Sequence, residues 1–567
     1  MIKAKDSRPS ILLHKCLQSQ SAGQATFQNP YSQIITMLNR MNQRNLCFWH
    51  MNSLLQVELR FKVKRMCGRE DQHEIKAKGC YRHARNNLTK GKEQLDWVRL
   101  QWVEELLISS INRYILSLLL GRKDESRSLL AALGLGTLMI SVGLFSIVYT
   151  FNNSLLTLVS QSFGQKDQKL SATYLNRQIY LIIILYIPQS FLLYRYTETV
   201  FLNLGIDPAI ASQGALYVRI CLYGHLFLNI SNCYQKYLSA QREVKMQMLA
   251  NLVSLFSHTF LIYILVINRG MGIEGVALAT SINYFLRFII LQVFIYFSRF
   301  NEHLIGMCRR RSRKHLLAQM RLGLKSVVMG IWQHWSYQMY SVIAIGLTHA
   351  DVIAAQYICI NIVSIFHVIP IALSMAFSVF IGNMIGSKRV ADAKAYVKLG
   401  IITGLLWGVA CGTIMIIFKQ QMISFFSSSM EIVTIVEKAY GILVFYVFAE
   451  PLSKVITGII TGLGKQGQAS IFTLIGYWVV GIPISITFIL YHGDSALFGI
   501  WLGASVSIVF IFIFQYFIIQ GTDYNEIVKE AELRRLRDQP TFSTLGNETL
   551  TDLRKQKDDL NQYQRLY

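Results

Sequence analysis

Long apolar segments dominate the chain from about residue 103 to about residue 520. Twelve of them approach the roughly 20 residues that a helix needs to cross the hydrocarbon core of a bilayer. They do not alternate apolar and polar residues, as transmembrane β-strands do. The pattern therefore predicts an all-α polytopic membrane protein with about twelve transmembrane helices. The predicted spans are residues 103–121, 128–151, 176–196, 212–235, 247–267, 275–298, 323–347, 353–379, 396–417, 439–463, 470–491 and 495–519.

The spans fall into two groups of six, separated by a short basic stretch. Residues 103–298 are predicted to form a first six-helix bundle and residues 323–520 a second one. Residues 299–322 would be the basic cytoplasmic loop that connects them. Residues 1–102 are polar and basic, and we expect a loosely ordered N-terminal extension. Residues 521–567 form a charged cytoplasmic tail.

Composition and charge agree with a membrane protein. Apolar residues make up 52% of the chain and charged residues only 16%, whereas a soluble domain is about 25% charged. The net charge of +24 could suggest nucleic acid, but the excess lies in the N-terminal extension and the central loop. Such a bias is typical of cytoplasmic segments, so both termini are predicted to be cytoplasmic and no nucleic-acid partner is expected. The short even-numbered connections are basic too, with Lys166, Lys169, Arg242, Lys245, Lys388, Arg389, Lys394 and Lys465.

Two segments depart from this simple pattern. The first span begins with two acids, Glu104 and Glu105, and contains Arg113. A charge at mid-bilayer costs about 2.5–3.5 kcal/mol on the insertion scale, so we expect that span to be short or shifted. In the tail, residues 526–537 have a charged helical pattern and are expected to form a solvated cytoplasmic helix.

Three landmarks recur in both halves, in the same order and at a nearly constant spacing. The pairs are Gly164 with Gly386, Gln241 with Gln466, and Gly275 with Gly499. A repeated unit with an even number of spans keeps its orientation, so a pseudo-two-fold axis along the membrane normal would relate the two bundles. Transporters with parallel repeats of this kind bind their ligand between the repeats, near the midplane.

Glu450 is the main candidate for a substrate or coupling-ion site. It follows the apolar stretch 441–449 and precedes Pro451. An intramembrane carboxylate is costly and marks a functional site by default. Burial favours its protonated form, so it could exchange a proton for a cationic substrate. The alternative is a structural ion pair with Lys454, four residues further along the helix.

Polar and aromatic residues of the seventh span could line the same cavity: Gln333, Trp335, Tyr337 and Gln338. Aromatic faces attract organic cations, and the amides could orient them. The alternative is that these side chains only pack or hydrogen-bond between helices. Histidines also occur in the spans, at positions 225, 258, 334 and 367. His334 is the best placed of them to relay a proton, although packing is the commoner role of such residues.

Four motifs lie on these spans. They are Thr157 to Gly164 at the end of the second span, Gln235 to Gln241 at the end of the fourth, Glu450 followed by Gly458 to Gln466 in the tenth, and Gly481 to Pro483 in the eleventh. Through them the sequence resembles the multidrug and toxic compound extrusion (MATE) family over about residues 105–520. The resemblance implies a twelve-helix antiporter that expels amphipathic organic cations in exchange for protons or sodium. The family often carries acids in the seventh span, where this chain has Gln333 and Gln338.

Three other functions stay open. A lipid-linked oligosaccharide flippase of related architecture would have a cationic cavity, so Glu450 argues against it. A membrane enzyme of the acyltransferase type would need a catalytic His or Asp in a polar re-entrant segment, and the repeat argues against that. A transport-inactive relative is favoured by Gln333, Gln338 and the poor first span.

The sequence lacks a phosphate-binding loop, since Lys465 is followed by Gln466 rather than Ser or Thr. We therefore expect a transporter rather than an enzyme, with no cofactor and no bound metal. The expected partners are a small organic cation, a proton or sodium as coupling ion, and the lipid bilayer, and we expect a monomer. The sequence predicts a multi-pass membrane protein and does not distinguish the plasma membrane from an internal vesicle or vacuole membrane.

Overall fold

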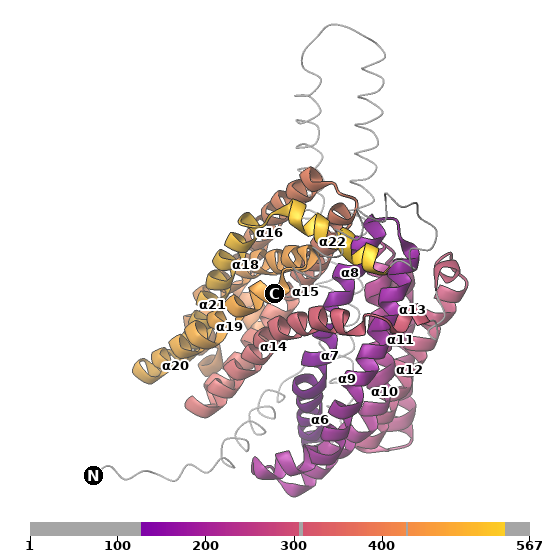
Figure 1. Ribbon diagram of the computed structural model, residues 1–567. Coiled ribbons are helices and arrows are strands. Elements are labelled where there is room, and N and C mark those ends of the chain that lie inside the picture. The colour runs from indigo at the N-terminus through magenta and orange to yellow at the C-terminus, as the bar shows by residue number, and fades with distance from the viewer. Residues whose placement is uncertain (1–125, 305–309, 427–428, 539–567) are drawn as a thin grey trace, which may run out of the picture.

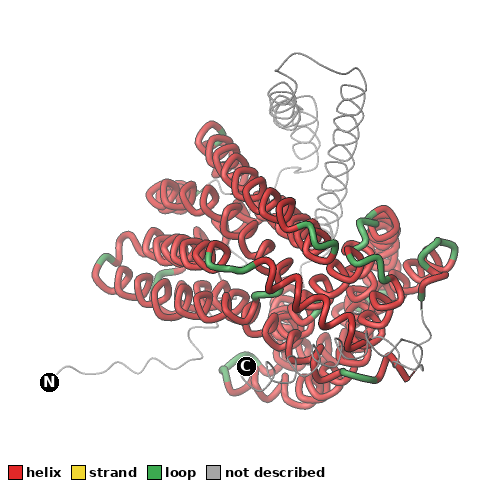
Figure 2. The backbone as a smooth tube through the Cα atoms, turned by 45° about the horizontal axis from the view of Figure 1, so that its top comes forward, coloured by secondary structure: helices red, strands yellow, loops and turns green. Residues whose placement is uncertain are grey.

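The computed structural model describes residues 126–304, 310–426 and 429–538. Within these ranges the chain is helical and has no strands, and loops are confined to the connections (Figure 2). The predicted first span and the N-terminal extension lie outside the described residues. So does the tail beyond residue 538. The prediction of an all-α polytopic membrane protein with two helical bundles is confirmed.

The described part of the first bundle contains five long rods, which correspond to the second to sixth predicted spans. The second span contains a wide π-helical turn and is the most broken of them. The elements are α6 (Ser126–Ile140), η2 (Ser141–Phe145), α7 (Ser146–Phe151), α8 (Asn153–Gly164), α9 (Gln168–Asn203), α10 (Pro208–Ala240), α11 (Lys245–Ile262), η3 (Tyr263–Asn268) and α12 (Gly272–Tyr296).

The second bundle contains six rods, which correspond to the seventh to twelfth predicted spans. Its elements are α14 (Leu316–Leu347), α15 (Ala350–Gly386), α16 (Val390–Ile417), α17 (Lys419–Phe426), α18 (Met430–Leu463), α19 (Gln466–Leu474), η5 (Ile475–Gly481), α20 (Ile482–Tyr491) and α21 (Ala496–Gln520). Short helices lie in the connections, and one more helix follows the bundle: η4 (Asn301–His303), α13 (Arg310–Arg313), η6 (Gly493–Ser495) and α22 (Tyr524–Asp538).

Nine helices of the described part are long and apolar enough to cross a membrane. The rods α10 and α14, with 33 and 32 residues, are long enough to cross as well but are not among these nine. Their polar side chains, such as Asn229, Lys236 and Ser336, are buried inside the protein. A helix that is surrounded by other helices does not need a fully apolar surface, because its polar groups can pair with neighbours instead of facing lipid.

Two predictions about the connections need correction. The predicted loop 299–322 is partly helical, because it contains α13 and because α14 already begins at Leu316. The solvated helix that was predicted in the tail is present as α22, but only part of its surface is exposed to solvent. Ile527 and Ala531 are 0% and 4% exposed, so one face of α22 is packed against the bundles.

The backbone repeats the pattern of the sequence landmarks. Lys166 and Lys388, at equivalent places in the turns after α8 and α15, have φ angles of 59° and 60°. Arg242 follows α10 and Gly464 follows α18, and the two are as far apart in sequence as Lys166 and Lys388. Their φ angles are 64° and 80°. Positive φ is uncommon for residues other than glycine. Its occurrence at matching places therefore supports two halves that fold alike.

The loops with these turns gather at one end of the molecule, which we call the basic end. The turns after α8, α10 and α15 border one shallow pocket, lined in part by Lys166, Arg242 and Ser387. In Figure 1 the described helices of the two bundles converge at this end, near α22 (yellow), and diverge toward the opposite end.

Reciprocal glycine contacts close the basic end. A Cβ added to Gly164 of α8 would lie 2.2 Å from the carbonyl oxygen of Asn383 in α15. A Cβ added to Gly386 of α15 would lie 1.9 Å from the carbonyl oxygen of Gln161 in α8. The two glycines are equivalent positions of the repeat, and so are their two partners. Each bundle therefore contacts the other through the same position of the repeat. This is the arrangement that a pseudo-two-fold axis between α8 and α15 requires.

Hydrogen bonds between the bundles support this closure. Thr157 of α8 donates from Oγ1 to the carbonyl oxygen of Thr461 in α18, over 2.6 Å. Gln466 of α19 donates from Nε2 to Thr157 Oγ1 at 2.9 Å, and Gln161 donates from Nε2 to the carbonyl oxygen of Gly462 at 3.2 Å. These polar groups lie in the motifs that the sequence singled out, and their role in this structure is to join the bundles.

Candidate substrate and coupling-ion site

Glu450 lies inside α18, within an apolar stretch of the second bundle, and is 1% exposed. Pro451 follows it without breaking the helix, which continues to Leu463. Proline has no N–H group and therefore leaves one helical carbonyl without its usual partner. Glu450 thus combines a buried carboxylate with a locally weakened helix.

The carboxylate of Glu450 contacts His367 of the neighbouring helix α15. The contact joins Oε1 of Glu450 and Nδ1 of His367. The two side chains differ in exposure, at 2% for Glu450 and 29% for His367. His367 is therefore the more accessible partner of the pair. Sequence reasoning named His367 among the span histidines but did not connect it with Glu450.

The proposed alternative pair, Glu450 with Lys454, is not the arrangement in the structure. Lys454 places its Nζ 5.8 Å from the centre of the Tyr337 ring, in a cation–π contact. Tyr337 therefore already has a cation over its face, which is the geometry by which aromatic rings bind organic ammonium groups.

Tyr337 belongs to a cluster of aromatic side chains in the second bundle. Its hydroxyl lies 2.8 Å from the hydroxyl of Tyr446, and its ring lies 6.1 Å from that of Tyr477. Tyr446 packs edge-on against Trp501 at 5.0 Å. Tyr446 and Trp501 were not singled out from the sequence. Tyr446 is one helical turn before Glu450, and that spacing was the signal available.

The other predicted residues of the seventh span do not all join this cluster. His334 places Nε2 3.0 Å from Ser141 Oγ in η2, and Trp335 donates from Nε1 to Ser146 Oγ in α7 at 3.2 Å. Both contact the first bundle, so α14 lies between the bundles. Gln333 and Gln338 are half-buried, and Gln333 lies one helical turn from Tyr337. The structure therefore places Tyr337 beside Lys454 and Tyr446, which lie one helical turn to either side of Glu450 on α18. It assigns His334 and Trp335 to the bundle interface.

Tyr337→Phe should lower the stability of the second bundle without removing the aromatic face. The substitution deletes the hydroxyl contact with Tyr446, and a typical hydrogen bond contributes about 1 kcal/mol. We expect a decrease of a few degrees in the apparent melting temperature of the detergent-solubilised protein. Tyr491→Phe is the matched control, because Tyr491 is 80% exposed. Equal melting temperatures for both variants would contradict the prediction.

The repeat, the bundle contacts and the buried carboxylate of Glu450 together define a polytopic transporter of two symmetric halves. Residues 103–264 and 327–487 match the MatE family model, which covers more than half of the chain. The chain therefore belongs to the MatE family of membrane transporters. The two matched blocks lie in the two halves, in agreement with the repeat.

Relatives and solved structures agree with this assignment. Protein DETOXIFICATION 16 of Arabidopsis thaliana is 26% identical over 407 residues, which are 71% of this chain and 83% of the relative. Multidrug and toxin extrusion protein 2 of Mus musculus is 24% identical over 383 residues, which are 67% of this chain and 65% of the relative. The crystal structure of the eukaryotic MATE transporter AtDTX14 superposes with a TM-score of 0.73 at 20% identity, over 79% of this chain and 99% of that structure.

Proposed function

We propose that this transporter is a secondary active antiporter, which exports organic cations in exchange for protons or sodium by alternating access. The observation that supports the proposal best is the contact between Glu450 and His367. It puts a buried anion beside a titratable base, on two different helices of one bundle. A carboxylate in that position can hold either a coupling ion or a cationic substrate.

Exchange follows from competition for one negative charge. A cationic substrate that pairs with Glu450 displaces the proton or sodium ion held there, and the coupling ion displaces the substrate in the other half of the cycle. By thermodynamic reciprocity, each ligand weakens the affinity for the other by the same factor. Tyr337 would receive the apolar and cationic parts of the substrate, since its ring already accepts the Lys454 ammonium group.

Alternation requires that the bundles open first at one end and then at the other. In the structure the basic end is closed by Gly164, Gly386 and the hydrogen bonds of Thr157. We propose that this end faces the cytoplasm, because its turns are rich in lysine and arginine. The conformation would then be the one that is closed toward the cytoplasm.

The native chain in proteoliposomes tests the proposal. A fluorescent organic cation should accumulate inside when the lumen is more acidic than the medium, or when the lumen contains sodium and the medium does not. Addition of ATP should change nothing, because the energy comes from the ion gradient. Liposomes without protein are the control. Monodisperse protein that moves the cation under neither gradient would overturn the proposal and favour a transport-inactive relative.

A second candidate function is the movement of an anionic, lipid-linked substrate. Cationic side chains also lie within the bundles: Lys454 over Tyr337, Lys236 at 6% exposure and Arg287 at 5%. These groups would suit an anion better than a cation. Transfer of a lipid-linked saccharide across the same proteoliposomes, without any effect of an ion gradient on organic cations, would support this alternative.

A further inference from the structure

The helix α22 follows the last span after a connection of only three residues, Gly521 to Asp523. Tyr524 and Ile527 pack into an apolar cluster of the second bundle that includes Ile385 and Leu463. Burial raises the pKa of the Tyr524 phenol to about 12. The start of α22 is therefore fixed to the second bundle by its short connection and by its packing.

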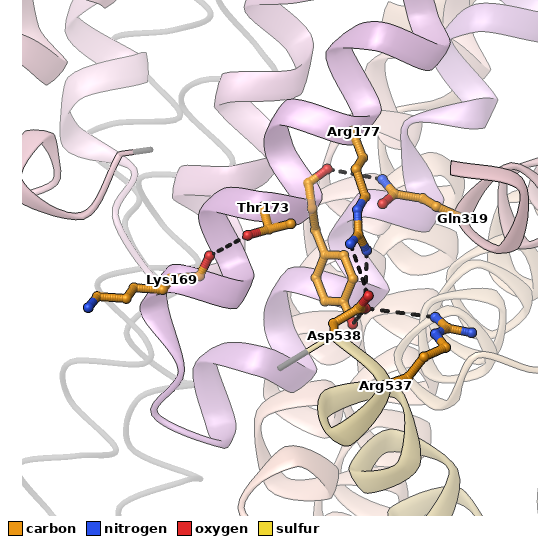
Figure 3. Close-up of polar contacts among 7 residues, drawn as sticks. Lys169, Thr173, Arg177, Gln319, Arg537 and Asp538 are labelled. Carbon is orange, nitrogen blue, oxygen red and sulfur yellow. Dashed lines mark hydrogen bonds and ion pairs between the residues drawn. The ribbon is translucent and has the colours of Figure 1, made fainter. Parts of the chain in front are cut away.

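The end of α22 is fixed to the first bundle by a buried ion pair. Asp538 receives two hydrogen bonds from Arg177 of α9, with Nη2 2.9 Å from Oδ1 and Nη1 3.1 Å from Oδ2 (Figure 3). The two side chains are 1% and 0% exposed. The hydroxyl of Tyr174 donates to Asp538 Oδ2 at 3.4 Å, and Gln319 of α14 donates to the carbonyl oxygen of Tyr174 at 3.0 Å.

Contacts along the middle of α22 reach both bundles. Arg535 lies 3.5 Å from Asp167, in the turn between α8 and α9. Gln165 of the same turn donates from Nε2 to the carbonyl oxygen of Ala531 at 3.0 Å. On the side of the second bundle, Lys388 pairs with Glu532 at 2.7 Å. In Figure 1, α22 crosses from one bundle to the other at the closed end.

These contacts constrain how the bundles can separate. Because α22 is joined to α21 by so short a connection, it must move with the second bundle. Its bonds to Arg177, Asp167 and Gln165 must then break whenever the basic ends of the bundles part. A buried charge is costly when its partner is removed, so the bidentate pair resists that motion far more than an exposed pair would.

We propose that α22 is a strap across the basic end, with the Arg177–Asp538 pair as its latch, and that the strap must detach from the first bundle each time the transporter opens to that side. The proposal rests on the alternating access proposed above. It assigns a conformational role to a helix outside the spans, and to an arginine of α9 that has no part in the candidate substrate site.

Reversible cross-linking tests the strap. Gln165→Cys with Arg535→Cys would be joined by a bis-maleimide whose spacer is cleaved by a thiol reductant. We expect the cross-link to lower gradient-driven transport at least about tenfold, because the second conformation is no longer populated, and we expect cleavage to restore it. Lys388→Cys with Glu532→Cys is the matched control, since it joins α22 only to the bundle with which it moves. Each sample is compared with the native chain treated in the same way, because the chain has nine cysteines of its own.

The experiment separates failure of the strap proposal from failure of the proposed function. If the first cross-link leaves transport at the rate of the control pair, the strap proposal is wrong although the antiporter proposal holds. If no sample transports any cation before cross-linking, the antiporter proposal fails, and the strap is then tested without transport. For that purpose the variant Ser160→Cys is labelled with a water-soluble maleimide. Ser160 is 0% exposed and packs against Gly382. Labelling should increase several-fold when Asp538→Asn is added, and unchanged labelling would overturn the strap.

Discussion

Replacing Glu450 by glutamine should reduce gradient-driven exchange of organic cations to the level of liposomes without protein. The amide has nearly the same shape as the carboxylic acid but carries no negative charge in either conformation. It can therefore neither pair with a cationic substrate nor release a proton to His367. Since coupling depends on competition for that charge, its loss removes exchange altogether rather than slowing it.

The measurement is uptake of a fluorescent organic cation into proteoliposomes under an imposed pH gradient. Glu437→Gln is the matched control on the same helix, because Glu437 is half-buried and pairs with Lys419 at 3.4 Å near the start of α18. Transport by that variant should equal that of the native chain. Equal transport by Glu450→Gln and the native chain would remove Glu450 from the mechanism.

Gly386→Ala should prevent closure of the basic end. The new Cβ would lie 1.9 Å from the carbonyl oxygen of Gln161, and the main chain of α8 cannot yield as a flexible side chain could. Overpacking of this kind costs about 1–3 kcal/mol. We expect a lower apparent melting temperature, several-fold faster maleimide labelling of Ser160→Cys and loss of transport.

Gly441→Ala is the control for this substitution. Gly441 also lies in a helix, but a Cβ there would have no neighbour within 4 Å. Alanine is about 1 kcal/mol more favourable than glycine in a helix interior, so that variant should be at least as stable as the native chain. If Gly386→Ala behaves like Gly441→Ala, the reciprocal contact does not control closure.

The spans and the repeat could be predicted because they depend on local properties. Apolar length locates a transmembrane helix, and the landmarks Gly164 and Gly386 mark equivalent turns without any knowledge of packing. The partners of these glycines could not be predicted, since Asn383 and Gln161 come from the opposite bundle. Apart from the loop 299–322, in which α14 already begins, the limits of the five segments into which the sequence was divided stay predictions.

The candidate site shows the same distinction between local and distant contacts. The spacing of Glu450 and Lys454 favours an ion pair on one helix face, but His367, which lies far away in sequence on α15, takes that place. Tertiary contacts of this kind leave no periodic signal. For α22 a signal was available, because Tyr524, Ile527 and Ala531 recur at helical spacing and form a buried stripe. The many charges of this helix hid that stripe.

The crossing of α8 and α15 also limits the type of domain motion that can separate the bundles. Gly164 is the only glycine within α8, so a displacement along the helix axis would bring residues with bulkier side chains to the point of closest approach. A shift of one helical turn, about 5.4 Å, would bring Ser160 there in place of Gly164. Shear between these helices is therefore sterically opposed, whereas a hinge that lifts one helix away from the other keeps both glycines in register for the return.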